Sequence, residues 1–245
     1  MKNEGAGTIL RAVTNPLKNR YLWGWMRTVG TGAVLACGGK PPVQGPAPAA
    51  PLPTGGMAGQ QVSVLPLTLV AAEEELHWDD ALADRRAALT RADSVIEAML
   101  RARAPEVNWI FPDDLRRAAR RAPAVAHNPD QMGTAMLRAE NISVVPDPLR
   151  SELRTLVALA GSGGGRYALI PAALVYRRSR PPEKASGDVG AEHAAPLHSG
   201  TAELSIAMVD VRLGRVDWRT VARGEGDDPW SSLGRAMKSV TPGLP

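Results

Sequence analysis

A single cysteine, Cys37, is the strongest constraint that this 245-residue chain places on its own fold. Because no second cysteine is present, no disulfide can form within the chain, and stability must come from a buried core. Residues 60–245 provide about 185 residues, which is enough for one domain with a substantial core. The sequence has no run of about 18 or more apolar residues, so we expect no membrane-spanning helix. These features predict one self-supporting domain.

The residues before Cys37 form a recognisable order. Arg27 is followed by a short run of small and apolar residues, 28–36, and then by the cysteine. This order resembles a bacterial lipoprotein signal sequence with its lipobox. The resemblance implies that residues 1–36 are a signal peptide that is removed, and that Cys37 becomes the lipid-bearing first residue of the mature protein. An ordinary buried thiol is the alternative. A translation start at Met26 would explain the unusually long leader.

The segment after the cysteine has the composition of a tether. Residues 37–59 are rich in proline, alanine and glycine and contain few large apolar side chains. Such a stretch cannot bury enough surface to offset the loss of chain entropy on folding. We therefore expect a lipid-anchored tether that reaches about 60 Å when extended, followed by a single α/β domain over residues 60–245.

The charge balance supports a division at the cysteine. The chain has 29 Lys and Arg against 25 Asp and Glu, and residues 1–36 hold five of those bases and one of those acids. The remainder then has 24 of each, with no net charge. Because a nucleic-acid partner requires clustered, uncompensated Lys and Arg, nucleic acid is disfavoured as a partner.

The periodicity of apolar residues predicts both strands and helices. Apolar and polar side chains alternate over residues 201–211, which indicates a strand with one covered face. The last three predicted strands follow one another closely, so we expect antiparallel pairing there and a mixed α/β sheet with helices packed on at least one face. The expected strands are 62–67, 107–111, 167–177, 201–211 and 215–223, and the expected helices are 81–103, 113–121, 148–160 and one from Asp228 onward.

One local motif stands out inside the predicted domain. Asp210 can accept hydrogen bonds from a turn, Gly214 can adopt a positive φ, and Trp218 can anchor the returning strand in the core. The three residues therefore predict a structural turn, with no ligand required.

Polar clusters offer one candidate for catalysis. Glu73–Glu75 and Asp79–Asp80 form an acidic cluster, which could perform acid–base chemistry if burial separated the proton affinities of its carboxylates. His127 would be its partner in an envelope hydrolase. A run this polar is usually solvated, so we expect no catalytic residues.

The remaining candidates for binding sites are weaker. The glycines of 161–165 follow a predicted helix and precede a strand, the reverse of a phosphate-binding loop, so they predict a helix stop. His193 and His198 lie in a polar loop without further metal ligands nearby in sequence. We therefore expect neither a metal nor a cofactor.

Three short motifs resemble a family of envelope lipoproteins that contains the curli-secretion channel subunit and the lipoprotein activator of penicillin-binding proteins. They are 62–67 (VSVLPL), 166–171 (RYALIP) and the Asp210, Gly214, Val216 and Trp218 pattern. The resemblance implies a core like the anticodon-binding domain. It also implies anchoring by lipid on Cys37 at the periplasmic face of the outer membrane, and action through protein–protein contact.

These observations favour a non-enzymatic adaptor that binds another envelope protein or associates with itself. A subunit of an oligomeric secretion assembly is an alternative, tested by the mass of the extracted protein. Pore formation is disfavoured because membrane barrels need several alternating segments of about 9–11 residues, and only 201–211 fits that pattern.

Overall fold

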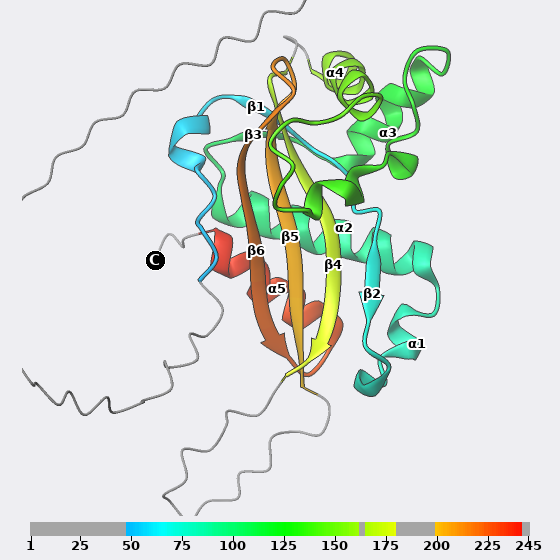
Figure 1. Ribbon diagram of the computed structural model, residues 1–245, viewed down its shortest axis with the longest axis vertical. Coiled ribbons are helices and arrows are strands. Elements are labelled where there is room, and N and C mark those ends of the chain that lie inside the picture. Colours follow the sequence, from blue (N-terminus) through cyan, green and yellow to red (C-terminus); the bar gives the residue numbers. More distant parts are fainter. Residues whose placement is uncertain (1–47, 162–164, 180–198, 242–245) are drawn as a thin grey trace, which may run out of the picture. The chain divides into compact units, whose positions relative to one another are not determined.

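The computed structural model describes residues 48–161, 165–179 and 199–241. The signal-peptide and lipidation predictions, including Cys37, and the loop histidines His193 and His198 lie outside these residues. The described residues belong to one unit, in which a mixed β-sheet is covered by helices (Figure 1). The predicted α/β fold class is confirmed.

The sheet combines parallel and antiparallel pairing. Its strands run in the order β3-β1-β4-β5-β6, and β2 pairs with β4 beyond the end of β1. β1 is parallel to β3 and β4, whereas β4, β5 and β6 form an antiparallel meander. The strands are β1 (Gln61–Val64), β2 (Val70–Ala72), β3 (Asn108–Ile110), β4 (Tyr167–Arg178), β5 (Gly200–Asp210) and β6 (Arg215–Gly226).

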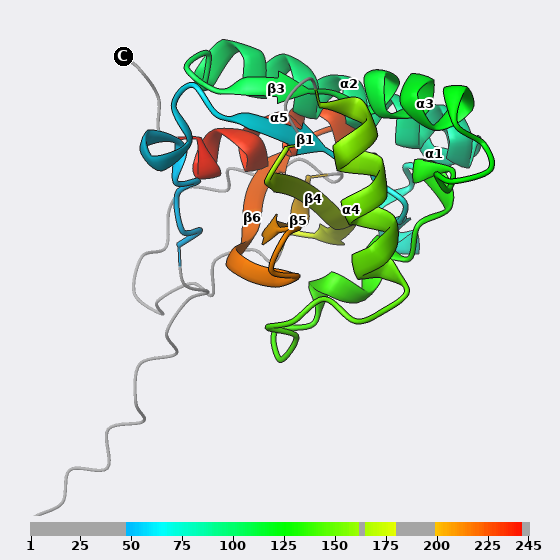
Figure 2. The same ribbon diagram turned by 90° about the horizontal axis from the view of Figure 1, so that it is seen from above.

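Helices lie on both faces of the sheet. Figures 1 and 2 show α2 and α5 along one face, with α4 against one end of the other face. None of the described helices is both long and apolar enough to cross a membrane. The α-helices are α1 (Asp79–Leu82), α2 (Arg85–Arg103), α3 (Pro112–Arg121), α4 (Leu149–Ala160) and α5 (Pro229–Val240); the short 3₁₀ helices are η1 (Thr54–Met57), η2 (Glu74–Leu76), η3 (Pro129–Gln131) and η4 (Thr134–Arg138).

Each sheet face has its own hydrophobic cluster. The first lies between the sheet and helices α2 and α5, and includes Leu204 and Ile206 from β5. The second lies beneath α3, α4 and η4, and includes Ile170 and Val209. β5 contributes to both clusters, because its second half is covered on both sides.

Side-chain caps mark where α2 and α5 begin. The Asp84 carboxylate accepts hydrogen bonds from the amides of Arg86 and Ala87 at the start of α2. The Asp228 carboxylate does the same for Trp230 and the residue after it at the start of α5. Side-chain capping of this kind satisfies amides that have no partner within the helix.

One helix packs on the sheet at unusually close range. Gly224 of β6 lies directly under α5, and a Cβ atom at this position would overlap the backbone at Ser232 and Ala236. A larger residue would force the helix and the strand apart. The glycine therefore sets the spacing between α5 and β6.

The predicted boundary at Gln60 is corrected by the structure, because part of the expected tether is folded. Leu52 and Met57 are each only 4% exposed and belong to the first hydrophobic cluster. The amide of Leu52 also donates to the carbonyl of Val240, at the end of α5. Two apolar side chains spaced among prolines and glycines are enough to hold this segment against the domain.

Two further differences concern the region after β1. The expected helix 81–103 is divided into α1 and α2, because Asp84 caps a new helix. Strand β2 was not expected, since its three residues are too few to show a period. Its pairing with β4 is decided by the sheet rather than by local sequence.

Candidate functional site

The turn between β5 and β6 is organised by a buried carboxylate. Asp210 has no exposed surface. One of its oxygens, Oδ1, accepts hydrogen bonds from the amides of Arg212 (2.9 Å) and Leu213 (3.0 Å). The other, Oδ2, lies 2.7 Å from Nε of Arg166, which precedes β4. The carboxylate thus links the turn to the neighbouring strand.

Gly214 and Trp218 complete this turn. Gly214 has a φ of 69°, which side chains rarely tolerate, and the side chain of Arg150 packs where a Cβ atom would stand. Its carbonyl accepts a hydrogen bond from the amide of Val145 at 2.8 Å. Trp218 is half-buried, lies opposite Met208 on β5 and packs against the first cluster. All these contacts are structural.

The pKa of Asp210 agrees with this role. Burial alone would raise the pKa, but hydrogen bonds from the Leu213 amide and from Arg166, with the positive charge of Arg166, outweigh burial and lower it below its usual range. A carboxylate held in its charged form by fixed donors is poorly suited to exchanging protons near neutral pH.

A second buried carboxylate was not anticipated from the sequence. Asp93 of α2 is 7% exposed, and its Oδ1 accepts a hydrogen bond from the amide of Leu67 at 2.9 Å. Its Oδ2 accepts one from Nη2 of Arg116 on α3 at 2.8 Å. The pair therefore connects α2, α3 and the segment that follows β1.

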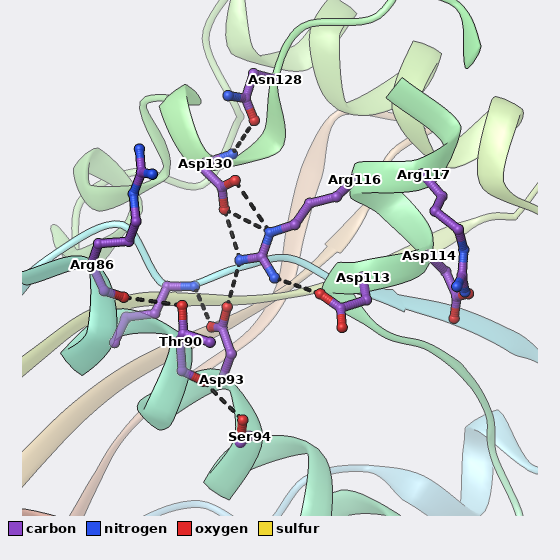
Figure 3. A network of polar contacts seen from close by, with 11 residues as sticks. Arg86, Thr90, Asp93, Ser94, Asp113, Asp114, Arg116, Arg117, Asn128 and Asp130 are labelled. Carbon is purple, nitrogen blue, oxygen red and sulfur yellow. Dashed lines mark hydrogen bonds and ion pairs between the residues drawn. The ribbon is translucent and has the colours of Figure 1, made fainter. Parts of the chain in front are cut away.

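Arg116 stands at the centre of a larger network (Figure 3). Its guanidinium also binds Asp130 in η3, at 2.7 Å from Nη2, and Asp113 in the first turn of α3, at 2.9 Å from Nη1. Burial alone would lower the pKa of Arg116, but the hydrogen bonds that it donates to Asp130, Asp93 and Asp113 raise it. Because three carboxylates occupy its donors, Arg116 holds three segments together rather than presenting a free cation.

The pKa of Asp93 moves the opposite way from that of Asp210. Burial raises it to about 6, although hydrogen bonds from the Leu67 amide and Arg116 and the charge of Arg116 lower it. A buried carboxyl that titrates near pH 6 can signal catalysis. Here both its oxygens are already engaged, so the geometry favours a structural role.

The proposed acidic cluster and His127 are not brought together. His127 is largely exposed, and its Nδ1 lies 3.7 Å from Glu152 on α4. Glu73 instead accepts a hydrogen bond from the amide of Arg178 at 2.8 Å, at the end of β4. In the described ranges no hydrogen bond or ion pair joins His127 to residues 73–80. The arrangement that the hydrolase alternative required is therefore not formed.

Other predicted site features are only partly described. Gly161 is the residue that follows the last turn of α4, whereas a phosphate-binding loop precedes a helix. Residues 162–164 lie outside the described ranges. No group of three or more His, Cys, Asp or Glu side chains within the described part of the chain is arranged to hold a metal ion.

One face of the sheet is accessible where the ends of β4 and β6 lie beside the start of β5. No described helix covers this part of the face in Figure 1. It borders an open depression of about 960 Å³. We call it the open sheet face and define it by six residues: Arg177, Thr201, Glu203, Val221, Arg223 and Glu225.

Charge pairs cross the open sheet face. Glu203 lies 2.9 Å from Nε of Arg177 on one side and 2.9 Å from Nε of Arg223 on the other. Arg177 also lies 3.3 Å from Glu73. Burial alone would raise the pKa of Glu203, but Arg223 and Arg177 lower it. The row of alternating charges spans three strands, and the side chains of Arg177 and Arg223 are 55% and 35% exposed.

Comparisons with known proteins give structural similarities alone. No family model and no curated protein matches the chain. Among solved structures, the PelC dodecamer from Paraburkholderia phytofirmans has 13% identity and a TM-score of 0.32, covering 74% of this chain and 87% of that one. The LpoB C-terminal domain from Salmonella enterica has 14% identity and a TM-score of 0.31, covering 70% and 85%. Similarity at this level does not assign the chain to a family.

Proposed function

We propose that this protein is a non-catalytic adaptor of the cell envelope, anchored by lipid on Cys37 at the periplasmic face of the outer membrane. It binds another envelope protein or a second copy of itself. The observation that carries this proposal is the open sheet face. A helix-free stretch of sheet, with charge pairs accessible at its surface, suits contact with another protein.

The composition of this face supports binding more than chemistry. Glu203 is held between Arg177 and Arg223, so it is charged and engaged rather than available as a base. Partially exposed ion pairs contribute little to stability, on the order of 0–1 kcal/mol each. Across an interface, arrangements of this kind contribute mainly to specificity and to the rate of association.

The sequence before the domain supports the anchor. A lipid on Cys37 would hold the domain within the reach of residues 38–47, since the folded segment begins by Pro48. Each buried methylene of an acyl chain contributes about 0.8 kcal/mol, and one chain alone gives marginal attachment. Two or three acyl chains on one terminus would give stable attachment.

Fractionation tests the anchor. Replacing Cys37 by Ala should move the protein from washed membranes into the soluble fraction. A Cys37→Ala protein that still sediments with membranes after a high-salt wash would refute the lipid anchor.

Crosslinking in intact cells tests the interaction surface. An Arg223→Glu variant reverses one charge of the open sheet face, and Arg215→Glu reverses a charge on the same strand outside it. We expect the crosslinked species of the wild type to decrease at least fivefold in Arg223→Glu alone. Its mass then separates self-association from binding to another protein. Equal crosslinking of both variants would exclude the open sheet face, and a wild type without crosslinked species would exclude the adaptor.

A further inference from the structure

Strand β2 has an outer edge whose backbone is not paired. The amide of Leu174 donates to the carbonyl of Leu69 (3.0 Å), and the amide of Glu73 donates to the carbonyl of Tyr176 (3.0 Å). Since backbone groups alternate in direction along a strand, Val70 and Ala72 point away from β4. Within the described residues, the N–H and C=O groups of Val70 and Ala72 make no hydrogen bond.

A groove runs along this edge. It has a volume of about 360 Å³, and all three residues of β2 line one side of it. The other side comes from α1 and the start of α2, with the apolar groups of Leu82 and Ala83. Figure 1 shows α1 beside the end of β2. We call this space the β2 groove; it lies between an edge strand and a helix.

The edge lacks several of the features that usually prevent strand pairing. Natural edge strands are protected by charged residues, proline, bulges, a covering segment or very short length. β2 is short, but its three residues include no charged residue and no proline. β2 has the sequence Val-Ala-Ala, and both alanines are exposed. Small side chains leave room for another backbone to approach at the roughly 4.8 Å spacing of paired strands.

Charged residues flank the groove. Arg85 donates one hydrogen bond, from Nη2 to the carbonyl of Thr68 (3.1 Å), just before β2. Asp79 begins α1 on the same groove. Neither residue forms an ion pair with another described residue. Two opposite charges beside one edge could set the direction of an added strand.

We propose that the β2 groove binds an extended peptide segment of a partner protein, which pairs with β2 as an additional strand. The segment would place small or aliphatic side chains toward Leu82 and Ala83 and an acidic group beside Arg85. This mode obtains affinity from main-chain hydrogen bonds and specificity from alternate side chains. The inference rests on the proposed adaptor function and gives it a second, distinct contact surface.

A single extended chain fits this site better than a second copy of the domain. The edge of β2 is recessed beside α1, and a second copy would bring its own α1 to the same edge. A peptide carries no such obstacle. The groove therefore favours a peptide over domain-to-domain strand pairing.

Two variants at one position test the proposal. In Ala72→Pro the outward N–H is lost while the pairing of β2 with β4 is retained, because that N–H does not face β4. In Ala72→Ser the N–H remains. The full chain, extracted in detergent, is used to select binders from a phage-displayed library of random seven-residue peptides. For a selected peptide, made synthetically, we expect Ala72→Pro to raise Kd at least tenfold and Ala72→Ser to change it less than twofold.

Hydrogen exchange gives a measurement that needs no variant. Saturating peptide should slow exchange of the Val70 and Ala72 amides in the wild type, and unchanged exchange there would overturn the proposal. So would a library without enriched peptides, or peptides that bind the wild type and a folded Ala72→Pro equally. A dimer that Ala72→Pro dissociates would assign the groove to a second copy. The crosslinking variants of the open sheet face remain a separate test of the adaptor function.

Discussion

Asp210 and Arg166 form an ion pair in which the carboxylate is fully buried while about half of the arginine side chain is exposed. The arginine thus neutralises a buried charge from the surface of the domain. The same carboxylate binds two amides of the β5–β6 turn. Losing its charge should affect both the pair and the turn, because one side chain serves both.

Replacing Asp210 by Asn should lower the free energy of unfolding by about 1–3 kcal/mol, since the charged hydrogen bond to Arg166 is lost in a buried position. Asp217→Asn is the control, because its pair with Arg215 lies at the surface and should contribute less than about 1 kcal/mol. Urea unfolding of both variants measures the difference. Equal effects would show that burial of Asp210 does not govern the contribution.

The lowered pKa of Asp210 means that its contribution to stability should decrease as pH falls. Its contribution is complete above the pKa of an unfolded aspartate, about 3.9, and is lost as pH falls through the lower folded value. Acid unfolding followed by circular dichroism should therefore be less steep in Asp210→Asn than in the wild type. An unchanged acid transition would contradict the assignment.

The pKa of Asp93 should make the free energy of unfolding decrease as pH rises, the opposite of the effect of Asp210. Its pKa is raised to about 6, so the folded state binds a proton more tightly than the unfolded state does. The stability from this group is present below about pH 4 and decreases by roughly 3 kcal/mol as pH rises through 6. Asp93→Asn cannot titrate, so its unfolding free energy should change less between about pH 4 and 7. Parallel curves for the two proteins would refute the raised pKa.

Substituting two glycines distinguishes the effect of close packing on stability from the effect of helix propensity. Gly224→Ala should destabilise the domain by about 1–3 kcal/mol, because the new methyl group meets the backbone of α5. Gly234 lies within α5 with open space around it, so Gly234→Ala should stabilise the domain by up to about 1 kcal/mol. Thermal unfolding should move in opposite directions for the two variants. Stabilisation by both would mean that α5 can move away without cost.

The packed segment before Gln60 can be tested with matched leucines. Leu52→Ala should cost about 2–5 kcal/mol, because Leu52 is only 4% exposed. Leu159 on α4 is 44% exposed, so Leu159→Ala should change stability by less than about 0.5 kcal/mol. Urea midpoints measure both. A Leu52→Ala variant with unchanged stability would mean that residues 48–59 belong to the tether and not to the folded domain.

The turn at Asp210 could be predicted from the sequence. Asp210 and Gly214 lie four residues apart, so the hydrogen bonds that shape their turn are local and follow from residue type. The Asp93–Arg116 pair was not predictable in this way. Its members lie on different helices, and either residue alone has the pattern of an ordinary helix surface position.

The alternation of apolar and polar residues predicts burial correctly for only the first half of β5. Along β5, Ala202, Leu204 and Ile206 are buried while Thr201 and Glu203 are partly exposed, as alternation predicts. From Ala207 onward both faces are buried, because segments distant in sequence cover the second face. The sequence of β5 alone therefore does not show that its second face is covered.

The sequence by itself determined the kind and order of the main elements, because helix caps, turns and strand alternation depend on residues a few positions apart. The tertiary structure decided which carboxylates are buried, that Leu52 joins the core, and that β2 keeps an open edge. Those outcomes depend on contacts between segments brought together by folding, where burial and the satisfaction of polar groups are settled across the whole domain. The role of Cys37 stays a prediction of the sequence.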